Sequence, residues 1–231
     1  MRGREPMMAV RPHAVAFDVV ETLMSLEPLR GRLVHLGQPG HLLETWFARL
    51  LRDGIALSAT GDYRRFPEVA ADALRAVTGY ELDGGQASWF LAGFDELPAY
   101  PDAEPALRRL HDAGIQVATL TNGTAESTRR FLDRTGLAPL VQQVISCEEV
   151  GSWKPPAAVY RHAVDTLATP RERVALVAVH AWDCHGAKRA GLTTGWCSRL
   201  ERRYGELFAA PDVVGADLVE VVDGLLALPE G

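Results

Sequence analysis

Short apolar runs of strand length alternate with longer amphipathic stretches along most of the chain. The apolar runs cover residues 13–17, 115–120, 141–146, 174–179 and 193–197. Between them, at residues 127–135 and 156–167, apolar side chains recur at the three- and four-residue spacing of a helix. This alternation predicts an α/β fold with a Rossmann-like parallel sheet and helices on both of its faces. Near the end of the chain we expect a helix at residues 186–190, a strand at 193–197, and Val213, residues 216–218 and Leu225 at the edge of the sheet.

A long segment of helical character separates the first predicted strand from the others. Apolar residues recur at helical spacing twice within it, first at Leu42, Leu43, Trp46, Phe47, Leu50 and Leu51, and then at Val69, Ala73, Leu74 and Val77. The α/β pattern resumes after Pro98 and Pro101. The pattern predicts an inserted helical cap at residues 23–97 and a core formed by residues 1–22 and 98–231.

The composition excludes several kinds of partner and site. A net charge of −6 and scattered arginines argue against nucleic acid, and no apolar run approaches the roughly 18 residues of a membrane span. Three cysteines without a CxxC pair argue against a disulfide framework or a zinc site, so a reducing, cytoplasmic location is expected. We expect residues 1–12 to form a disordered leader rather than a signal peptide.

Candidate chemistry begins with Asp18, the carboxylate that ends the first apolar run. An aspartate at such a point is often only a helix cap, so its position alone decides nothing. Three later segments add polar groups at or just beyond the ends of apolar runs. These are residues 119–123 (Thr-Leu-Thr-Asn-Gly), 153–155 (Trp-Lys-Pro) and 180–183 (His-Ala-Trp-Asp). Ligand sites of open parallel sheets form where strands end in this way.

The order Asp18, Thr121, Lys154, Asp183 resembles the haloacid dehalogenase superfamily over nearly the whole chain, and most closely its (S)-2-haloacid dehalogenase (type II) group. The resemblance implies the fold of that superfamily, a Rossmann-like core with a helical cap. It implies that Asp18 attacks the substrate and forms an ester that water hydrolyses. Lys154 would keep the nucleophile ionised, and Asp183 would position or activate the water.

The other residues of these segments carry weaker indications. Thr121 and Asn122 are expected to bind an anionic group of the substrate, although the segment also suits an ordinary turn with a polar cap. Trp182 would lie beside the site, although a tryptophan is more often a packing residue than a contact to substrate. Asp183 could also simply pair with Lys154, and the two roles are compatible.

Two positions separate the chain from the phosphatases of the superfamily. Those enzymes carry a second aspartate two residues after the nucleophile as a general acid, and here that position is Val20. Such help is worth about 10²–10⁴-fold for an alkoxide, whereas a halide leaves without a proton. Val179 stands where the phosphatases place a further magnesium ligand. We therefore expect no cofactor, and Mg²⁺ only if the protein is a phosphatase.

Other positions depart from the dehalogenases. Phe47 occupies the place of the cap arginine that receives the halide, and Arg49 and Arg52 point away from its face of the helix. Val20 replaces an aromatic or amide residue, and His180 replaces an asparagine. His180 could orient water, donate a proton to a leaving group, or be a buried histidine with a structural partner.

The sequence therefore predicts a hydrolase that acts through Asp18 on a small anionic substrate, with 2-haloacids favoured. A slow phosphatase and a binding protein without catalysis are the alternatives. The predicted contacts to substrate come from Thr121, Asn122, Val20, Phe47, His180 and Trp182. His185 is expected to face solvent or a partner, and the resemblance implies a homodimer.

Overall fold

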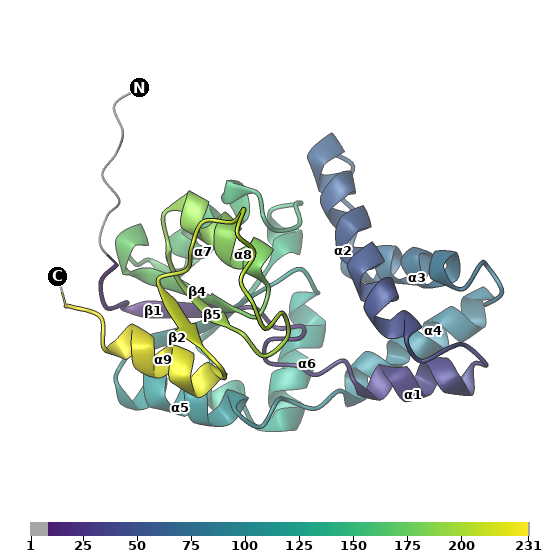
Figure 1. Cartoon of the computed structure of the whole chain (residues 1–231), viewed down its shortest axis with the longest axis horizontal. Helices are drawn as coiled ribbons and strands as arrows, with labels where there is room; N and C mark the ends of the chain where they lie inside the picture. The colour runs from purple at the N-terminus through teal and green to yellow at the C-terminus, as the bar shows by residue number, and fades with distance from the viewer. Residues whose placement is uncertain (1–8, 231) are drawn as a thin grey trace.

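Six parallel strands form one sheet in the order β3-β2-β1-β4-β5-β6 (Figure 1). The computed structural model describes residues 9–230. The strands are β1 (Ala14–Phe17), β2 (Gln116–Thr121), β3 (Gln143–Ser146), β4 (Val174–Ala178), β5 (Thr193–Cys197) and β6 (Val213–Gly215). β1 lies in the middle, paired with β2 on one side and β4 on the other. This arrangement confirms the predicted α/β fold with a parallel sheet.

Helices cover both faces of the sheet because successive side chains of each buried strand point to opposite sides. Val15 and Phe17 of β1 belong to the core beneath α5 (Ala103–Asp112), α6 (Ala125–Thr135) and α9 (Leu218–Leu226). Ala14 and Ala16 belong to the core beneath α7 (Ala157–Leu167) and α8 (Ala181–Ala190). The strands are therefore apolar throughout, as their sequences indicate.

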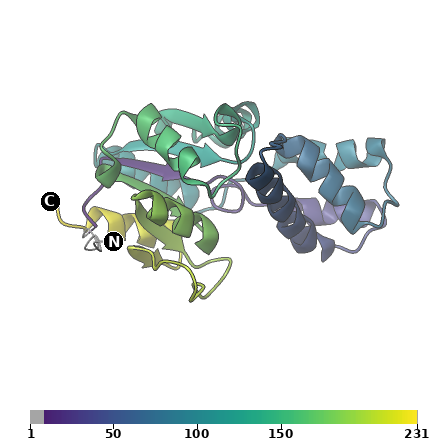
Figure 2. The same cartoon turned by 90° about the horizontal axis from the view of Figure 1, so that it is seen from above.

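Four helices and a 3₁₀ turn form a second lobe between β1 and α5 (Figures 1 and 2). They are α1 (Pro28–His35), α2 (Leu42–Thr60), α3 (Phe66–Val77), α4 (Gly84–Ala92) and η1 (Gly93–Glu96). Trp46 of α2 is fully buried and its indole N–H donates to the Ala70 carbonyl of α3 at 2.9 Å. The predicted helical insert is confirmed. Among the helices at residues 9–230, none has the length and apolar character needed to cross a membrane.

Trp153 joins this lobe to the core. Its ring lies so close to Gly54 that a Cβ there would come within 2.4 Å of it. Its backbone N–H donates to the Ser58 hydroxyl at 2.8 Å, and its indole N–H donates to the Arg64 carbonyl at 2.9 Å. Its ring also stacks on Phe66, with centroids 5.7 Å apart. The residue before Lys154 is thus held by the cap.

Three expectations about the elements require correction. α8 begins at Ala181 rather than 186, so Asp183 lies in the first turn of a helix. Leu218 and Leu225 lie on α9 rather than in the sheet, because their apolar neighbours Val221 and Val222 complete a helical spacing. The remaining short helices are η2 (Ala138–Leu140), η3 (Cys147–Glu149) and η4 (Arg171–Arg173). The third correction concerns the expected leader. Its residues 1–8 lie outside the described residues, but at its end the Arg11 amide donates to the Pro229 carbonyl at 2.8 Å, so this part is ordered.

Candidate active site

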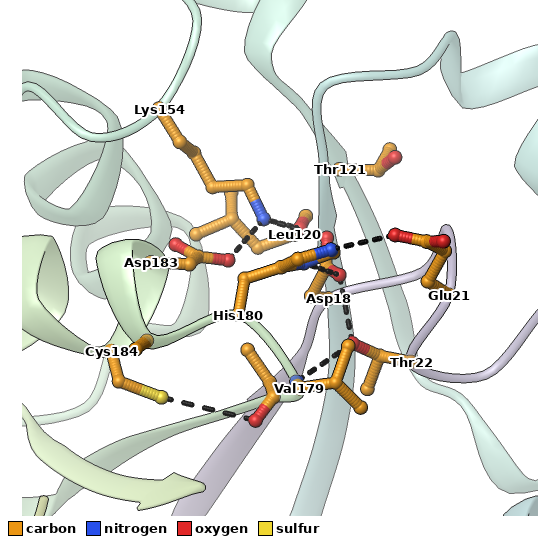
Figure 3. A network of polar contacts seen from close by, with 12 residues as sticks. Asp18, Glu21, Thr22, Leu120, Thr121, Lys154, Val179, His180, Asp183 and Cys184 are labelled. Atoms are coloured by element: carbon orange, nitrogen blue, oxygen red, sulfur yellow. Dashed lines mark hydrogen bonds and ion pairs between the residues drawn. The ribbon is translucent and has the colours of Figure 1, made fainter. Parts of the chain in front are cut away.

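The four segments singled out in the sequence meet at the carboxyl edge of the sheet (Figure 3). Asp18 follows β1, Thr121 ends β2, Lys154 follows β3 and η3, and Asp183 follows β4 on α8. This convergence follows from the parallel sheet, in which every strand ends at the same edge.

Lys154 is the centre of the cluster and is completely buried. Its Nζ lies 2.8 Å from Asp18 Oδ1 and 2.6 Å from Asp183 Oδ2. The third proton is donated to the Leu120 carbonyl at 3.0 Å. An ammonium group has three donors and no acceptor, so Lys154 has no capacity left for another partner.

The second oxygen of Asp18 faces two other groups. The Thr22 hydroxyl donates to Oδ2 at 2.8 Å and itself accepts from the Val179 amide at 3.2 Å. His180 Nδ1 lies 3.4 Å from the same oxygen. The sequence analysis gave Thr22 no chemical role. A hydroxyl four residues after the carboxylate, in the same turn, is the signal that could have identified it.

The charged groups in this buried cluster shift one another's pKa values. Burial alone would raise the pKa of Asp18, but the ammonium of Lys154 and the ring of His180 hold the pKa of that carboxyl well below its usual range. Burial would lower the pKa of Lys154, and Asp18 and Asp183 raise it instead. The pKa of Asp183 is raised, because burial and the charge of Asp18 outweigh Lys154. Asp18 is therefore held ionised at neutral pH.

His180 is clamped between two carboxylates. Its Nε2 lies 2.9 Å from Glu21 Oε2, while Nδ1 faces Asp18. Burial would lower the pKa of His180, but its contacts with Asp18 and Glu21 raise it to about 10, so the ring is an imidazolium at neutral pH. Glu21 was missed in the sequence. It adopts a left-handed backbone with φ of 67°, which is unusual for a residue other than glycine and is therefore a conformational cost at this position.

Tyr160 is another residue that the sequence analysis missed. Its hydroxyl donates to Asp183 Oδ1 at 2.6 Å, and the side chain is fully buried. It lies on α7, one residue after Val159 and three before Ala163, so the helical pattern placed it on the buried face. A buried tyrosine usually has a partner for its hydroxyl, which is the signal that pointed to a polar neighbour.

A small cavity of about 10 Å³ lies over Asp18, which is room for about one water molecule. The residues around it are Asp18, Val20, Phe47, Leu51, Phe66, Thr121, Asn122, His180 and Trp182. All six predicted contact residues are therefore on the cavity wall. The rings of Phe47 and Trp182 lie 6.2 Å and 5.4 Å from the ring of His180. Leu51 shares the wall with Phe47.

A larger cavity of about 150 Å³ adjoins the first across Val20, Phe66 and Thr121. Leu91 and Phe94 of the cap and Ser127 of α6 line its other side. This volume is comparable to that of a cavity that holds a benzene-sized molecule. The two cavities together form the space between cap and core nearest to Asp18.

The polar side chains of the turn after β2 already have hydrogen-bond partners within the protein. Asn122 Oδ1 accepts from the Lys154 amide at 2.9 Å, and the Thr121 hydroxyl accepts from the Gly123 amide at 2.9 Å. These bonds hold Lys154 and the turn in place. Binding of a substrate anion by Thr121 and Asn122 stays a prediction.

The remaining candidates lie away from the cavity. Arg49 and Arg52 pair with Asp53 at 3.3 Å and 2.7 Å, as expected from their direction on α2. His185 does not face solvent freely: it is half-buried, and its Nδ1 accepts from the Ala209 amide at 2.9 Å. Its exposure to solvent is smaller than expected because the Ala209 amide and the Phe208 ring lie against it, and a contact with a partner stays a prediction.

Oxygen ligands for a metal are scarce near Asp18. Val20 and Val179 offer no side-chain ligand, and the ammonium of Lys154 occupies the space between the two carboxylates. Within residues 9–230, no group of three or more His, Cys, Asp or Glu side chains is arranged to hold a metal ion. The residues at this site therefore do not fit a bound Mg²⁺ ion.

Known proteins resemble this chain over most of its length. A profile of the haloacid dehalogenase-like hydrolases matches residues 12–191. The chain is 30% identical over 213 residues to (S)-2-haloacid dehalogenase H-109 of Pseudomonas putida, covering 90% of this chain and 91% of that one. It is 30% identical over 222 residues to (S)-2-haloacid dehalogenase 1 of Pseudomonas sp. (strain CBS-3), covering 94% and 98%. The crystal structure of L-2-haloacid dehalogenase from Xanthobacter autotrophicus with chloropropionic acid covalently bound has a TM-score of 0.85 at 22% identity, covering 92% and 97%.

Proposed function

The chain belongs to the haloacid dehalogenase-like hydrolases, and we propose that it cleaves the carbon–halogen bond of a small 2-haloacid through an ester on Asp18. The observation that carries this proposal is the buried contact of Lys154 with both Asp18 and Asp183. A carboxylate held ionised by a fixed ammonium group, at the wall of a cavity, is equipped to act as a nucleophile.

In the first step Asp18 attacks the carbon that bears the halogen, and the halide leaves with the bonding electron pair. Thr22 and Lys154 fix the carboxylate by one hydrogen bond to each oxygen. Val20 has no proton to give, and a halide needs none. The same valine would leave an alkoxide without help, which is why we favour halide over phosphate ester substrates.

In the second step water attacks the ester and restores Asp18. Both oxygens of Asp183 are already occupied, one by Lys154 and one by Tyr160, and its side chain is completely buried. We therefore assign Asp183 to holding Lys154 in place and charged, rather than to activating the water as the resemblance implied.

Substrate entry requires either movement of the cap, which we take as residues 23–97, or access from the larger adjoining cavity. The cavity over Asp18 holds about one water, so a 2-haloacid fits only if Phe47 and its neighbours move away or if it reaches in from the larger adjoining cavity. The combined space suits a small acid without a cofactor, and no step of the proposed reaction requires one.

Steady-state assays on 2-chloropropionate and on a panel of phosphate esters, with EDTA or with added magnesium, test the proposal. We expect chloride release that EDTA does not change. Phosphate release that depends on magnesium would instead support the slow phosphatase. Saturable binding of a 2-haloacid without any turnover would support a binding protein.

A single turnover in water enriched in heavy oxygen tests the ester itself. If Asp18 is the nucleophile, the heavy oxygen enters the Asp18 carboxylate first, and the hydroxy acid of the first turnover carries ordinary oxygen. Peptide mass spectrometry locates the label. Label in the product of the first turnover would mean direct attack by water and would overturn the proposal.

A further inference from the structure

The two cavities between cap and core differ greatly in size. The cavity over Asp18 has a volume of about 10 Å³, and the cavity beside it has about 150 Å³. The smaller cavity is next to the nucleophile, so the bond that breaks has to lie there. No step of the proposed reaction uses the larger cavity, which leaves its volume to a part of the substrate that does not react.

Three residues lie on the walls of both cavities. They are Val20 from the loop after β1, Phe66 from α3 of the cap, and Thr121 at the end of β2. All three side chains are buried. They mark the place where a group bound over Asp18 comes nearest to the larger cavity.

Val20 determines how much space is free at this place. Its side chain is only 8% exposed. Its loop is held by the Val19 carbonyl, which accepts from the amides of Leu23 and Met24, both at 2.9 Å. Because the backbone is fixed, a larger side chain at position 20 would extend into the space that the two cavities share. Valine leaves more of that space free than any larger apolar side chain.

The wall of the larger cavity is mostly apolar. Val19, Met24 and Phe66 are buried side chains on this wall, and Leu91 and Phe94 of the cap are partly buried. Such side chains offer no strong donor or acceptor to a polar ligand. They favour a hydrocarbon group, because moving apolar surface out of water is favourable.

The threonine hydroxyls on this wall have partners in the backbone. The Thr121 hydroxyl accepts from the Gly123 amide at 2.9 Å, and the Thr124 hydroxyl accepts from the Ser127 amide at 3.0 Å. The Thr128 hydroxyl donates to the Thr124 carbonyl at 3.0 Å. These bonds stabilise the turn and the start of α6. They give the polar groups of the wall a structural role that needs no charged ligand.

The charged side chains on this wall pair with each other. Within the described part of the chain they are Asp95 of η1 and Arg130 of α6, which lie 3.1 Å apart, and Arg130 also pairs with Glu126 at 2.6 Å. Asp95 and Arg130 are both more than half exposed, so they lie at the rim of the cavity. A second carboxylate on a substrate would therefore have to compete with two carboxylates for Arg130.

The geometry of displacement gives the substrate a group that points sideways. The attacking oxygen of Asp18 and the departing halide lie in line, on opposite sides of the reacting carbon. The carboxylate, the hydrogen and the side chain on that carbon therefore project away from this line. A side chain that extends past Val20 enters the larger cavity without blocking Asp18 or the halide.

We propose that the larger cavity binds the side chain on carbon 2 of the substrate, and that Val20 is the specificity-determining residue that admits it. The substrate class is then 2-haloacids with an uncharged, apolar side chain up to about the size of a benzene ring, rather than haloacetate or 2-chloropropionate. The proposal rests on the proposed function, since this side chain belongs to the substrate of that reaction.

A series of 2-chloro acids tests the size of the subsite. The value of kcat/KM for chloride release is measured for 2-chloropropionate, 2-chlorobutyrate, 2-chlorohexanoate and 2-chloro-3-phenylpropionate. Each value is divided by the rate constant of the same acid with hydroxide, which corrects for intrinsic reactivity. We expect a rise of about fourfold for each added methylene, and of about tenfold or more from the first acid to the last. Equal or falling values along the series would overturn the subsite.

A matched pair of acids tests the chemical class. The side chains of 2-chlorohexanoate and 2-chloroadipate each have four carbon atoms, and only the second ends in a carboxylate. We expect kcat/KM to be at least about tenfold lower for 2-chloroadipate, because its charge would lose water in an apolar cavity. Equal or higher values for 2-chloroadipate would overturn the assignment to apolar side chains.

Two variants narrow the space from opposite sides, Val20→Phe from the core and Leu91→Trp from the cap. The measurement is the ratio of kcat/KM for 2-chloro-3-phenylpropionate to that for 2-chloropropionate, in which any general loss of activity cancels. We expect this ratio to fall by about tenfold or more. Val34→Phe makes the first substitution at a 60% exposed position of α1 and should keep the wild-type ratio. Leu91 is only partly buried, so Leu91→Trp decides if Val20→Phe does not fold. An unchanged ratio in a folded variant would overturn the role of this cavity.

Binding without turnover separates the subsite from the reaction. Calorimetric titration with 3-phenylpropionate and with propionate should give a dissociation constant at least about tenfold lower for the first, and Leu91→Trp should remove this difference. Equal dissociation constants would overturn the subsite alone. No chloride release from any of the 2-chloro acids would overturn the proposed function, and the substrate class with it.

Discussion

The Tyr160 hydroxyl donates a 2.6 Å hydrogen bond to Asp183 Oδ1 in a region without solvent. We expect Tyr160→Phe to lower the free energy of unfolding by about 1.5–3 kcal/mol, because a buried charged acceptor loses its donor. Turnover should fall by about tenfold as Asp183 and Lys154 become less well fixed. Urea unfolding and halide release measure the two effects. Tyr204→Phe is the control: it removes another tyrosine hydroxyl that bonds only to backbone carbonyls, and equal losses of turnover in both variants would refute the role of Tyr160.

Gly54→Ala should loosen the joint between cap and core. A Cβ at Gly54 meets the Trp153 ring at 2.4 Å, and this ring is fully buried and cannot move freely. Overpacking of this kind costs about 1–3 kcal/mol in unfolding free energy. Gly31→Ala, in an open position on α1, should be neutral or slightly stabilising. Thermal unfolding compares the two, and equal stability would show that Trp153 has room to give way.

Phe47→Arg should raise chloride release from 2-chloro acids. The ring lies on the cavity wall, and a guanidinium there would receive the halide, which is worth about tenfold or more if one charged hydrogen bond forms. Phe47→Leu keeps the wall apolar and should show no gain. A ratio of the two kcat/KM values near one, in folded protein, would count against this role for α2.

Stability should fall as pH rises above neutrality. His180 has a pKa raised to about 10, above its ordinary value of 6.5, so its stabilising contribution is complete below pH 6.5 and is lost between pH 6.5 and 10. One proton gives a slope of up to about 1.4 kcal/mol per pH unit. Urea unfolding between pH 6.5 and 8.5 should show this slope in the wild type and a flatter line in His180→Asn. Parallel lines would mean that His180 is not an imidazolium in the folded protein.

Asp18→Asn should abolish turnover and also destabilise the fold. A nucleophile in an open cleft would leave stability unchanged, but Asp18 is only 6% exposed and is paired with Lys154. Removing one partner of a buried ion pair lowers the free energy of unfolding by about 3–5 kcal/mol. We expect the lower end of this range, because Lys154 retains its ion pair with Asp183 in the variant. Asp112→Asn, on an exposed part of α5, serves as the control in the same unfolding assay. Residual turnover in Asp18→Asn would exclude this residue as the nucleophile.

The sequence was informative wherever one local pattern determined the outcome. The apolar runs predicted the sheet, and the polar residues at their ends predicted that Asp18, Lys154 and Asp183 would meet. Residues whose role depends on a partner distant in sequence were harder to identify. The role of Glu21 depends on its contact with His180, which follows 159 residues later in the sequence. The role of Tyr160 likewise depends on its contact with Asp183. The hydrophobic periodicity of the sequence contains no information about such pairs.

The start of α8 was misjudged for a related reason. We interpreted residues 180–183 as the end of an apolar run, but α8 already begins at Ala181, inside this segment. The early start puts His180 just before the helix and Asp183 in its first turn, so the two side chains reach the site from different directions. The predicted homodimer and the exact limits of the cap stay predictions.

Trp153 connects the cap to the residue that contacts Asp18. The contacts of its ring and backbone with Gly54, Ser58 and Arg64 are all made to the cap. The next residue in the chain is Lys154, whose ammonium keeps Asp18 ionised. The cap residues that hold Trp153 are therefore one peptide bond away from the residue that supplies this ammonium. Packing in the cap and the charge beside Asp18 are thus connected through two consecutive residues of the chain.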